Sequence, residues 1–161
     1  MVTTQKAKSI AVALDGSAPG WEAFSRALNM ARLLSLPLDV LYVIQLRKAG
    51  YFAFIDRHLM EDEEAYAKQV CKEAHDRAQT KGVEVTTQIL ENEKDPSMAI
   101  VEFLEAARGV KFLVIGSYGH GFKNRAILGS TTERVIREIA RRGIPVPVLV
   151  VPASSSLPEE D

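Results

Sequence analysis

The residues best suited to chemistry lie in a glycine-rich stretch near the C-terminal end of the sequence. Four glycines lie between positions 116 and 129, and Ser130 and Thr131 follow at once. Glycine lets backbone N–H groups approach an anion closely and permits positive φ. Residues 130–133 read Ser-Thr-Thr-Glu, the pattern of a capping box, which predicts that a helix starts at Ser130. Since the first N–H groups of a helix favour anions, the stretch predicts a cradle for phosphate groups.

Other residues in this stretch can add to such a cradle. Lys123 and Arg125 bring positive charge. His120 is equally consistent with a phosphate contact and with a solvated side chain. The alternative interpretation is that the glycines only form a tight loop and Ser130 only caps a helix. Neither the G-x-x-x-x-G-K-[ST] pattern nor a G-x-G-x-x-G pattern after the first strand is present, which disfavours a Walker-type NTPase and a common dinucleotide fold.

The elements that must position this loop alternate along the chain. Continuous apolar runs predict buried strands at residues 9–14, 38–44, 111–115 and 146–151, and an alternating β-branched run predicts a strand at 83–89. Helical spacing predicts helices at 18–35, 57–81, 96–107 and 130–142, with Asp95 as an N-cap and Gly82 and Gly143 at helix ends. The predicted buried seam of the second helix is Tyr66, Val70, Ala74 and Ala78, and the first helix is expected to bury Leu34.

This alternation predicts an α/β fold. We expect a doubly wound, five-stranded parallel sheet in the order 3-2-1-4-5 with helices on both faces, similar to Rossmann-like and adenine nucleotide alpha hydrolase-like folds. Ligands of such sheets bind at the carboxyl ends of the strands where the winding reverses, here between strands one and four. Asp15, Gly16 and Ser17 follow strand one, and Gly116 follows strand four. The residues with unusual chemistry therefore meet at one place.

Composition limits the classes of function. The 161 residues predict one domain over 1–152 and a disordered acidic tail over 153–161. A net charge of −1 argues against nucleic acid, and no long apolar run predicts a membrane span. The single cysteine, Cys71, fits a reducing, cytoplasmic location. We expect no catalytic residues, since paired carboxylates and a Ser-His-Asp set are lacking. His58 and His75 have no partners at metal-ligand spacing.

The glycine spacing resembles that of a known family. Gly116-x2-Gly119-x9-Gly129-Ser130 fits the G-2x-G-9x-G-[ST] signature of universal stress proteins of the ATP-binding type. The resemblance covers nearly the whole chain and includes the opening strand with its Asp turn at 10–17, Asp95-Pro96 and the closing strand at 147–151. Tyr118 is less typical of the family.

The resemblance implies a function and a set of site residues. Similar proteins bind ATP, often with Mg²⁺, and pair into dimers through the last strand. Asp15 matches the acidic residue beside the nucleotide, where it can also face Mg²⁺, and Val43 matches the residue whose main chain meets the adenine. The groups around ribose and phosphates match Gly116, Gly119, Gly129, Ser130 and Thr131. The resemblance thus implies a stress-response regulatory protein that binds ATP or AMP.

Several alternatives remain open on the sequence. The chain can instead be a slow ATP hydrolase of the same superfold, or a structural dimer that no longer binds nucleotide. Asp15 can serve only to form an Asx-turn before the first helix. The apolar strand from Val146 to Val151 leaves a sheet edge that pairs with a second copy, unless the tail or a helix covers it. The aromatic residues Tyr51, Phe52 and Phe54 either close over a base or cover the sheet edge.

Overall fold

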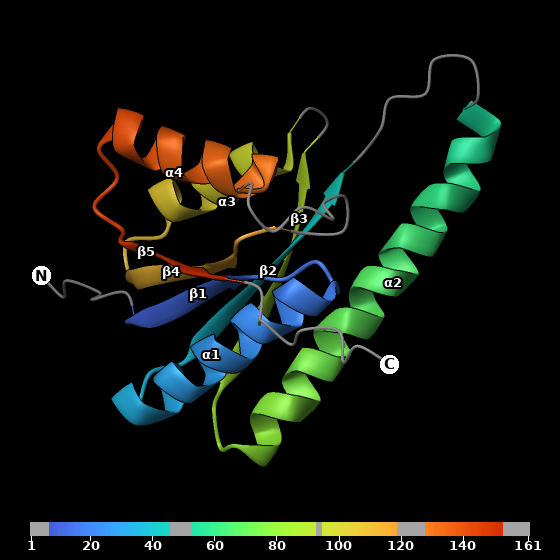
Figure 1. Cartoon of the computed structure of the whole chain (residues 1–161). Coiled ribbons are helices and arrows are strands. Elements are labelled where there is room, and N and C mark those ends of the chain that lie inside the picture. Colours follow the sequence, from blue (N-terminus) through green and yellow to red (C-terminus); the bar gives the residue numbers. More distant parts are fainter. Residues whose placement is uncertain (1–6, 46–52, 93–94, 119–127, 153–161) are drawn as a thin grey trace, which may run out of the picture.

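The computed structural model describes residues 7–45, 53–92, 95–118 and 128–152 (Figure 1). Its strands form one parallel sheet in the order β3-β2-β1-β4-β5, which confirms the predicted topology. The strands are β1 (Ser9–Ala13), β2 (Leu38–Gln45), β3 (Val85–Asn92), β4 (Val110–Gly116) and β5 (Val148–Val151). The helices are α1 (Ala18–Leu34), α2 (Ala53–Thr80), α3 (Pro96–Ala106) and α4 (Ser130–Arg142).

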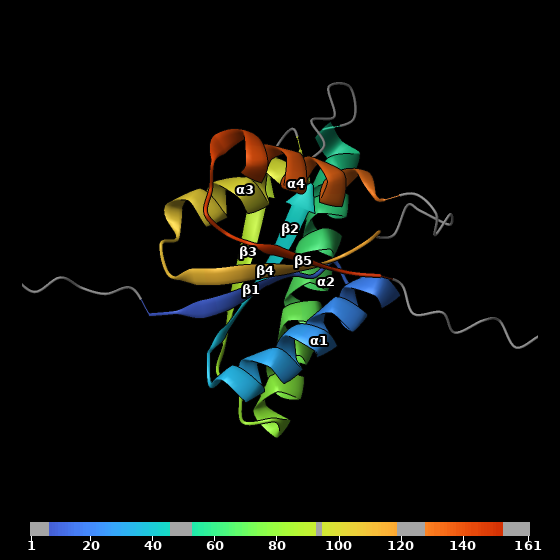
Figure 2. The same ribbon diagram turned by 60° about the vertical axis from the view of Figure 1, so that its left-hand side comes forward.

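Helices cover both faces of the sheet. Figures 1 and 2 show α1 and α2 on one face and α3 and α4 on the other. Successive side chains of a strand point to opposite faces, so Ile10 and Val12 of β1 enter the core under α1 and α2, whereas Ala11 enters the core under α3 and α4. Burial on both sides is the reason that β1 is apolar at every position after Ser9.

The helix ends follow the predicted turn chemistry at most places. The Asp95 side chain accepts a hydrogen bond from Ser97 N at 3.0 Å and caps α3, with Pro96 in its first turn. Gly82 and Gly143 have φ of +70° and +63° beyond the ends of α2 and α4, in the left-handed region that glycine reaches without strain. The start of α3 and the ends of α2 and α4 are therefore determined by local residues.

Several predicted boundaries and faces are wrong. α2 begins at Ala53 instead of near residue 57, and β3 lies at 85–92 instead of 83–89. β5 begins at Val148, so Pro147 precedes the strand and only its carbonyl enters the ladder, accepting from Leu113 N at 2.9 Å. This placement suits a residue without an N–H group.

The buried faces of α1 and α2 also differ from the prediction. Tyr66 is 42% exposed and Leu34 is 53% exposed. Val70, Ala74 and Ala78 of α2 are buried as predicted, and Ala67 and Cys71 complete the buried face in place of Tyr66. Both added residues have small side chains, so the larger and more hydrophobic Tyr66 does not mark the buried face of this helix.

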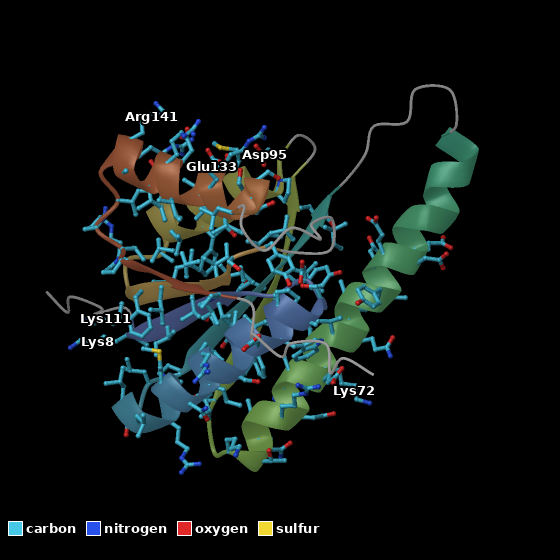
Figure 3. All side chains as sticks on the ribbon, viewed as in Figure 1. Lys8, Lys72, Asp95, Lys111, Glu133 and Arg141 are labelled. Carbon is cyan, nitrogen blue, oxygen red and sulfur yellow. The ribbon has the colours of Figure 1, made fainter. Side chains whose placement is uncertain are left out.

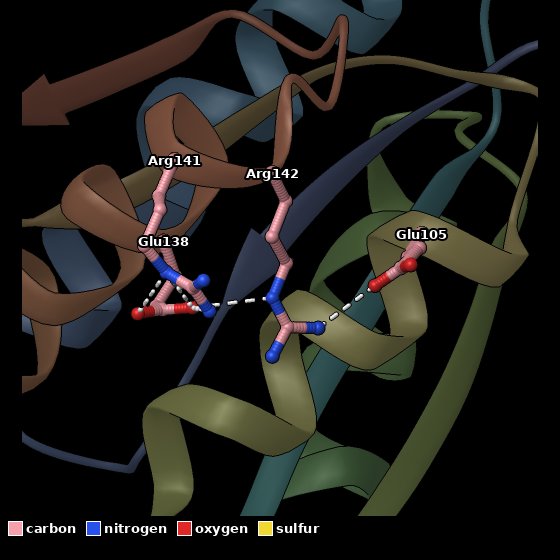
Figure 4. A network of polar contacts seen from close by, with 4 residues as sticks. All are labelled: Glu105, Glu138, Arg141 and Arg142. Atoms are coloured by element: carbon pink, nitrogen blue, oxygen red, sulfur yellow. Dashed lines mark hydrogen bonds and ion pairs between the residues drawn. The ribbon is translucent and has the colours of Figure 1, made fainter.

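Ion pairs join the two helices of the α3–α4 layer near both of their ends. Arg134 of α4 contacts Asp95 at the start of α3 at 2.6 Å, and Arg142 contacts Glu105 near its end at 2.8 Å. Figure 4 shows that Arg142 also reaches Glu138, which binds Arg141, and Figure 3 shows Asp95 and Glu133 on this side of the sheet. Each exposed pair contributes little by itself, but together they fix α4 beside α3.

None of the helices in the described ranges is both long enough and apolar enough to cross a membrane. The segment 46–52 with Tyr51 and Phe52, the side chain of Phe54 and the predicted acidic tail at 153–161 lie outside the described residues and side chains.

Candidate functional site

The two turns with unusual sequence lie side by side. β1 pairs with β4 in parallel, with Val12 opposite Val114, so the chain leaves both strands at the same edge of the sheet. The turn at Asp15 follows β1, and Gly116 ends β4. The predicted reversal of winding between strands one and four is therefore present, and it is where parallel sheets bind ligands.

The first turn is built around the Asp15 carboxylate. Its Oδ1 accepts hydrogen bonds from Ser17 N at 2.9 Å and from Ser17 Oγ at 2.5 Å. Ser17 is the N-cap of α1, and its Oγ accepts from Gly20 N at 3.1 Å. The Asx-turn expected as an alternative for Asp15 is therefore present, and Ser17, rather than Asp15, caps the helix.

Because Gly20 has no side chain, the Asp15 carboxylate can lie directly against it. A Cβ on Gly20 would lie 2.5 Å from Asp15 Oδ1 and 3.2 Å from Ser17 Oγ. The shorter distance means that a side chain at position 20 would displace the Asp15 carboxylate. The Asp15 side chain is thus packed against the first turn of α1, in a position set by Ser17 and by Gly20, which lies outside the matched segment 10–17.

The start of α4 contradicts the predicted capping box. Its N-cap is Gly129, with φ −60° and ψ 148°, and no side-chain hydrogen bond caps this end within the described part of the chain. Ser130 is already the first helical residue, and Glu133 pairs with Arg137 at 2.6 Å instead of reaching back. α1 and α3, in contrast, are capped by Ser17 and Asp95. Among the described residues, no capping side chain therefore accepts from the first N–H groups of α4.

Two hydrogen bonds close the base of the glycine-rich loop. Gly129 N donates to Ser117 O at 2.7 Å, and Thr132 Oγ1 donates to Gly116 O at 2.7 Å. Ser117 N in turn donates to Val151 O at 2.9 Å, which joins the loop to the sheet. These contacts hold the end of β4 against the first turn of α4.

Close backbone packing favours glycine at both ends of this loop. A Cβ on Gly129 would lie 3.0 Å from Tyr118 Cα, and a Cβ on Gly116 would lie 3.2 Å from Pro19 O. The two glycines thus have a packing role in addition to any contact with a ligand. The middle of the loop, with Gly119, His120, Lys123 and Arg125, lies outside the described residues.

Val43 reaches the same edge from β2. Ala13 at the end of β1 pairs with Leu41, so Val43 stands two residues farther along, level with Asp15. Its half-buried side chain packs on the α3–α4 side of the sheet. Of the predicted site residues, the structure brings Asp15, Val43 and Gly116 to one edge, together with Gly129, Ser130 and Thr131 at the start of α4.

Two tyrosines that the sequence reasoning did not place at the site flank the first turn. The Tyr66 hydroxyl lies against Gly16, whose φ is +81°, and the Tyr42 and Tyr66 rings meet edge to face with centroids 6.4 Å apart. Burial raises the pKa of Tyr42 to about 12, with smaller contributions from the charges of Tyr66 and Asp15. A signal for this contact is the glycine directly after Asp15, which leaves room for an aromatic ring.

The described residues contain no group of three His, Cys, Asp or Glu side chains that could hold a metal ion. Asp15 is the carboxylate nearest the switch point among the predicted site residues. Mg²⁺ in nucleotide sites is commonly held by one or two carboxylates together with phosphate oxygens. A single aspartate therefore fits Mg²⁺ only together with a bound nucleotide.

Comparison with known proteins agrees with this architecture. The model of the universal stress protein family matches residues 6–152. Universal stress protein MJ0531 of Methanocaldococcus jannaschii is 32% identical over 150 residues, which cover 89% of this chain and 81% of the relative. The structure of universal stress protein UspA from Lactobacillus plantarum superposes with a TM-score of 0.74 at 23% identity and covers 90% of this chain and 99% of its own.

Solved structures of this fold include nucleotide complexes. A universal stress protein from Archaeoglobus fulgidus is bound to dAMP (TM-score 0.65, 22% identity, 91% of this chain and 98% of that one). A family protein from Arabidopsis thaliana is bound to AMP (TM-score 0.65, 19% identity, 92% and 93%). Another universal stress protein is bound to cAMP (TM-score 0.66, 22% identity, 93% and 100%). The family match over almost the whole described chain shows that this protein belongs to the universal stress protein family.

Proposed function

We propose that this protein binds an adenine nucleotide at the switch point between β1 and β4. The observation that carries the proposal is the start of α4, which receives no capping side chain from the described residues and is joined to the end of β4 through Gly129 and Ser117. Phosphate groups satisfy the free N–H groups of such a helix start and interact favourably with its dipole. Members of the family with AMP, dAMP and cAMP support the choice of ligand.

In this proposal each predicted site residue has a position-dependent role. The main chain of Val43 meets the adenine, and Asp15 lies beside the ribose or a phosphate-bound Mg²⁺. The backbone of Gly116, Gly119 and Gly129 gives the phosphates close access, and Ser130 and Thr131 add hydroxyl donors. Their side chains occupy the first turn of α4, where Ser130 is exposed and Thr131 half-buried.

We further propose that the ligand is ATP or AMP, with Mg²⁺ in the case of ATP, and that residues 1–152 act as one cytoplasmic, stress-responsive regulatory domain. The edge strand β5 supports pairing of two copies, because Leu149 is 40% exposed there and β5 has a paired neighbour on one side only within the described sheet. Nucleotide occupancy would then regulate the association of such a dimer or of a partner.

The experiment that tests nucleotide binding is calorimetric titration of the nucleotide-stripped protein with ATP, with and without Mg²⁺, and with AMP. We expect saturable binding, stronger for ATP when Mg²⁺ is present. Failure of the folded protein to bind any of these would favour a structural dimer. Gly129→Val should also abolish binding, but its side chain would press on Tyr118, 3.0 Å from the new Cβ, so a loss of binding in that variant has two causes.

A further inference from the structure

Thr132 joins two parts of the site without belonging to the glycine signature. Its side chain is buried, with 3% of the residue exposed, and its Oγ1 donates to the carbonyl of Gly116 at 2.7 Å. The bond connects residues 16 positions apart, the last residue of β4 and the first turn of α4. A threonine in the middle of a helix commonly bonds a carbonyl of the preceding turn, whereas the hydroxyl of Thr132, in the first turn, bonds the end of β4.

This bond is one of two that close the base of the loop. The other runs from Gly129 N to Ser117 O at 2.7 Å. Ser117 and Gly129 stand at the two ends of the loop, and the bond between them holds these ends together. The two bonds therefore fix the end of β4 relative to the first N–H groups of α4. A change in either bond alters the position of α4 relative to β4.

The hydroxyl, and not the shape of the side chain, makes this connection. Valine has the same branched shape as threonine and no donor, so Thr132→Val would leave the buried Gly116 carbonyl without this partner. Serine keeps the hydroxyl and loses one methyl group. The pair of variants therefore separates the hydrogen bond from the packing.

We propose that Thr132 is a positioning residue of the nucleotide site, which sets the first turn of α4 at the distance from β4 that the phosphate groups require. The inference rests on the proposed nucleotide-binding function and adds a residue to it. Thr132 does not touch the nucleotide in this proposal, since its hydroxyl is engaged by Gly116. Its effect is confined to the part of the affinity that the phosphates supply.

Comparison of ATP with adenosine isolates that part. For Thr132→Val we expect the affinity for ATP to fall by about tenfold and the affinity for adenosine to stay within about twofold of the wild-type value. Thr132→Ser should bind both ligands as the wild type does. A matched control is Thr80→Val, which removes a hydroxyl-to-carbonyl bond of the same length, 2.7 Å to Arg77 O, at the end of α2. This control should change neither affinity.

Titration calorimetry of the four proteins with both ligands tests the proposal, together with amide hydrogen exchange without ligand. We expect the Gly129 amide to exchange faster in Thr132→Val than in Thr132→Ser or Thr80→Val, because its bond to Ser117 lies beside the deleted one. If the valine variant fails to fold, Thr132→Ala can replace it, because alanine and serine at this position differ only by the hydroxyl group.

The outcomes separate the two levels of the argument. A folded wild-type protein that binds no ATP refutes the nucleotide site and this inference together. Wild-type binding with unchanged ATP affinity in the valine variant refutes only the positioning role. Equal losses for ATP and adenosine refute it as well, because they indicate a general loosening of the fold.

Discussion

Replacement of Ser130 by aspartate should affect stability and nucleotide binding in opposite directions. Ser130 is the first residue of α4 and is exposed, so an aspartate fits there without repacking. A carboxylate in the first turn interacts favourably with the helix dipole and is worth about 0.3–1 kcal/mol. The free energy of unfolding should therefore increase slightly in the variant.

The same carboxylate should oppose phosphate binding. It would lie where the first N–H groups of α4 meet an anion, and it replaces a hydroxyl donor by a negative charge. Two like charges about 6 Å apart at an effective dielectric constant of about 20 repel each other by roughly 3 kcal/mol. This energy corresponds to a loss of about a hundredfold in the affinity for ATP.

Urea unfolding and calorimetric titration on the same preparations measure both effects. Ser25→Asp is the matched control, because it adds the same charge at an exposed position in the middle of α1. It should leave ATP affinity within a few-fold of the wild type. Should Ser130→Asp bind ATP as tightly as Ser25→Asp, the start of α4 is not where the phosphates bind. A loss of stability in Ser130→Asp would show instead that this helix end is already satisfied.

Three further predictions follow from the described contacts. Gly20→Ala should remove the increase in ATP affinity that Mg²⁺ gives in calorimetry, because the new Cβ would lie 2.5 Å from Asp15 Oδ1 and displace that carboxylate. An unchanged effect of Mg²⁺ would contradict the role of Asp15. Between about pH 10 and 12 the unfolded state loses the Tyr42 proton while the folded state keeps it. The free energy of unfolding, measured with urea, should therefore fall by roughly 1–3 kcal/mol over this range, and Tyr42→Phe should lack this fall. Leu149→Arg should give monomers in sedimentation analysis, since Leu149 is 40% exposed on the edge strand; persistent dimers would place the interface elsewhere.

The sequence predicts the fold well because strands that are buried on both faces of a parallel sheet are continuous apolar runs. Ile10, Ala11 and Val12 are all fully buried, two on one face of the sheet and one on the other, and only an uninterrupted apolar run satisfies both layers. The turn residues are local as well, since Asp95 caps the helix that directly follows it. Alternation of such segments leaves few possible topologies.

The face of α2 shows where periodicity stops being informative. Val70, Ala74 and Ala78 are buried as predicted, but Ala67 and Cys71 share that face, whereas Tyr66 turns toward Gly16. An aromatic residue at helical spacing predicts a core position by its hydrophobicity. Here its ring packs against Tyr42 and its hydroxyl reaches the turn after β1, a contact between distant segments that no local pattern contains.

The capping box is a second local pattern that the structure does not form. Residues 130–133 fit the pattern, but the backbone conformation at Gly129 makes that residue the cap. The third position of the pattern, Thr132, is held by Gly116 from 16 residues away, and Glu133 is held by Arg137. Glu133, which the motif assigns to the helix end, is thus paired within α4, and Thr132, which the motif leaves unassigned, makes the contact with a distant segment.

This failure strengthens the proposed site. A capping box would have occupied first-turn N–H groups of α4. The glycines alone do not separate a binding loop from an inherited shape, because packing against Tyr118 and Pro19 favours Gly129 and Gly116 in either case. A helix end that only maintained the fold would gain stability from a side-chain cap of the kind that Ser17 and Asp95 supply to α1 and α3. The described residues supply no such side chain to the start of α4, and a bound anion would satisfy its first N–H groups. An aspartate at position 130 distinguishes the two cases, because only a phosphate site loses function when the helix end is made more stable.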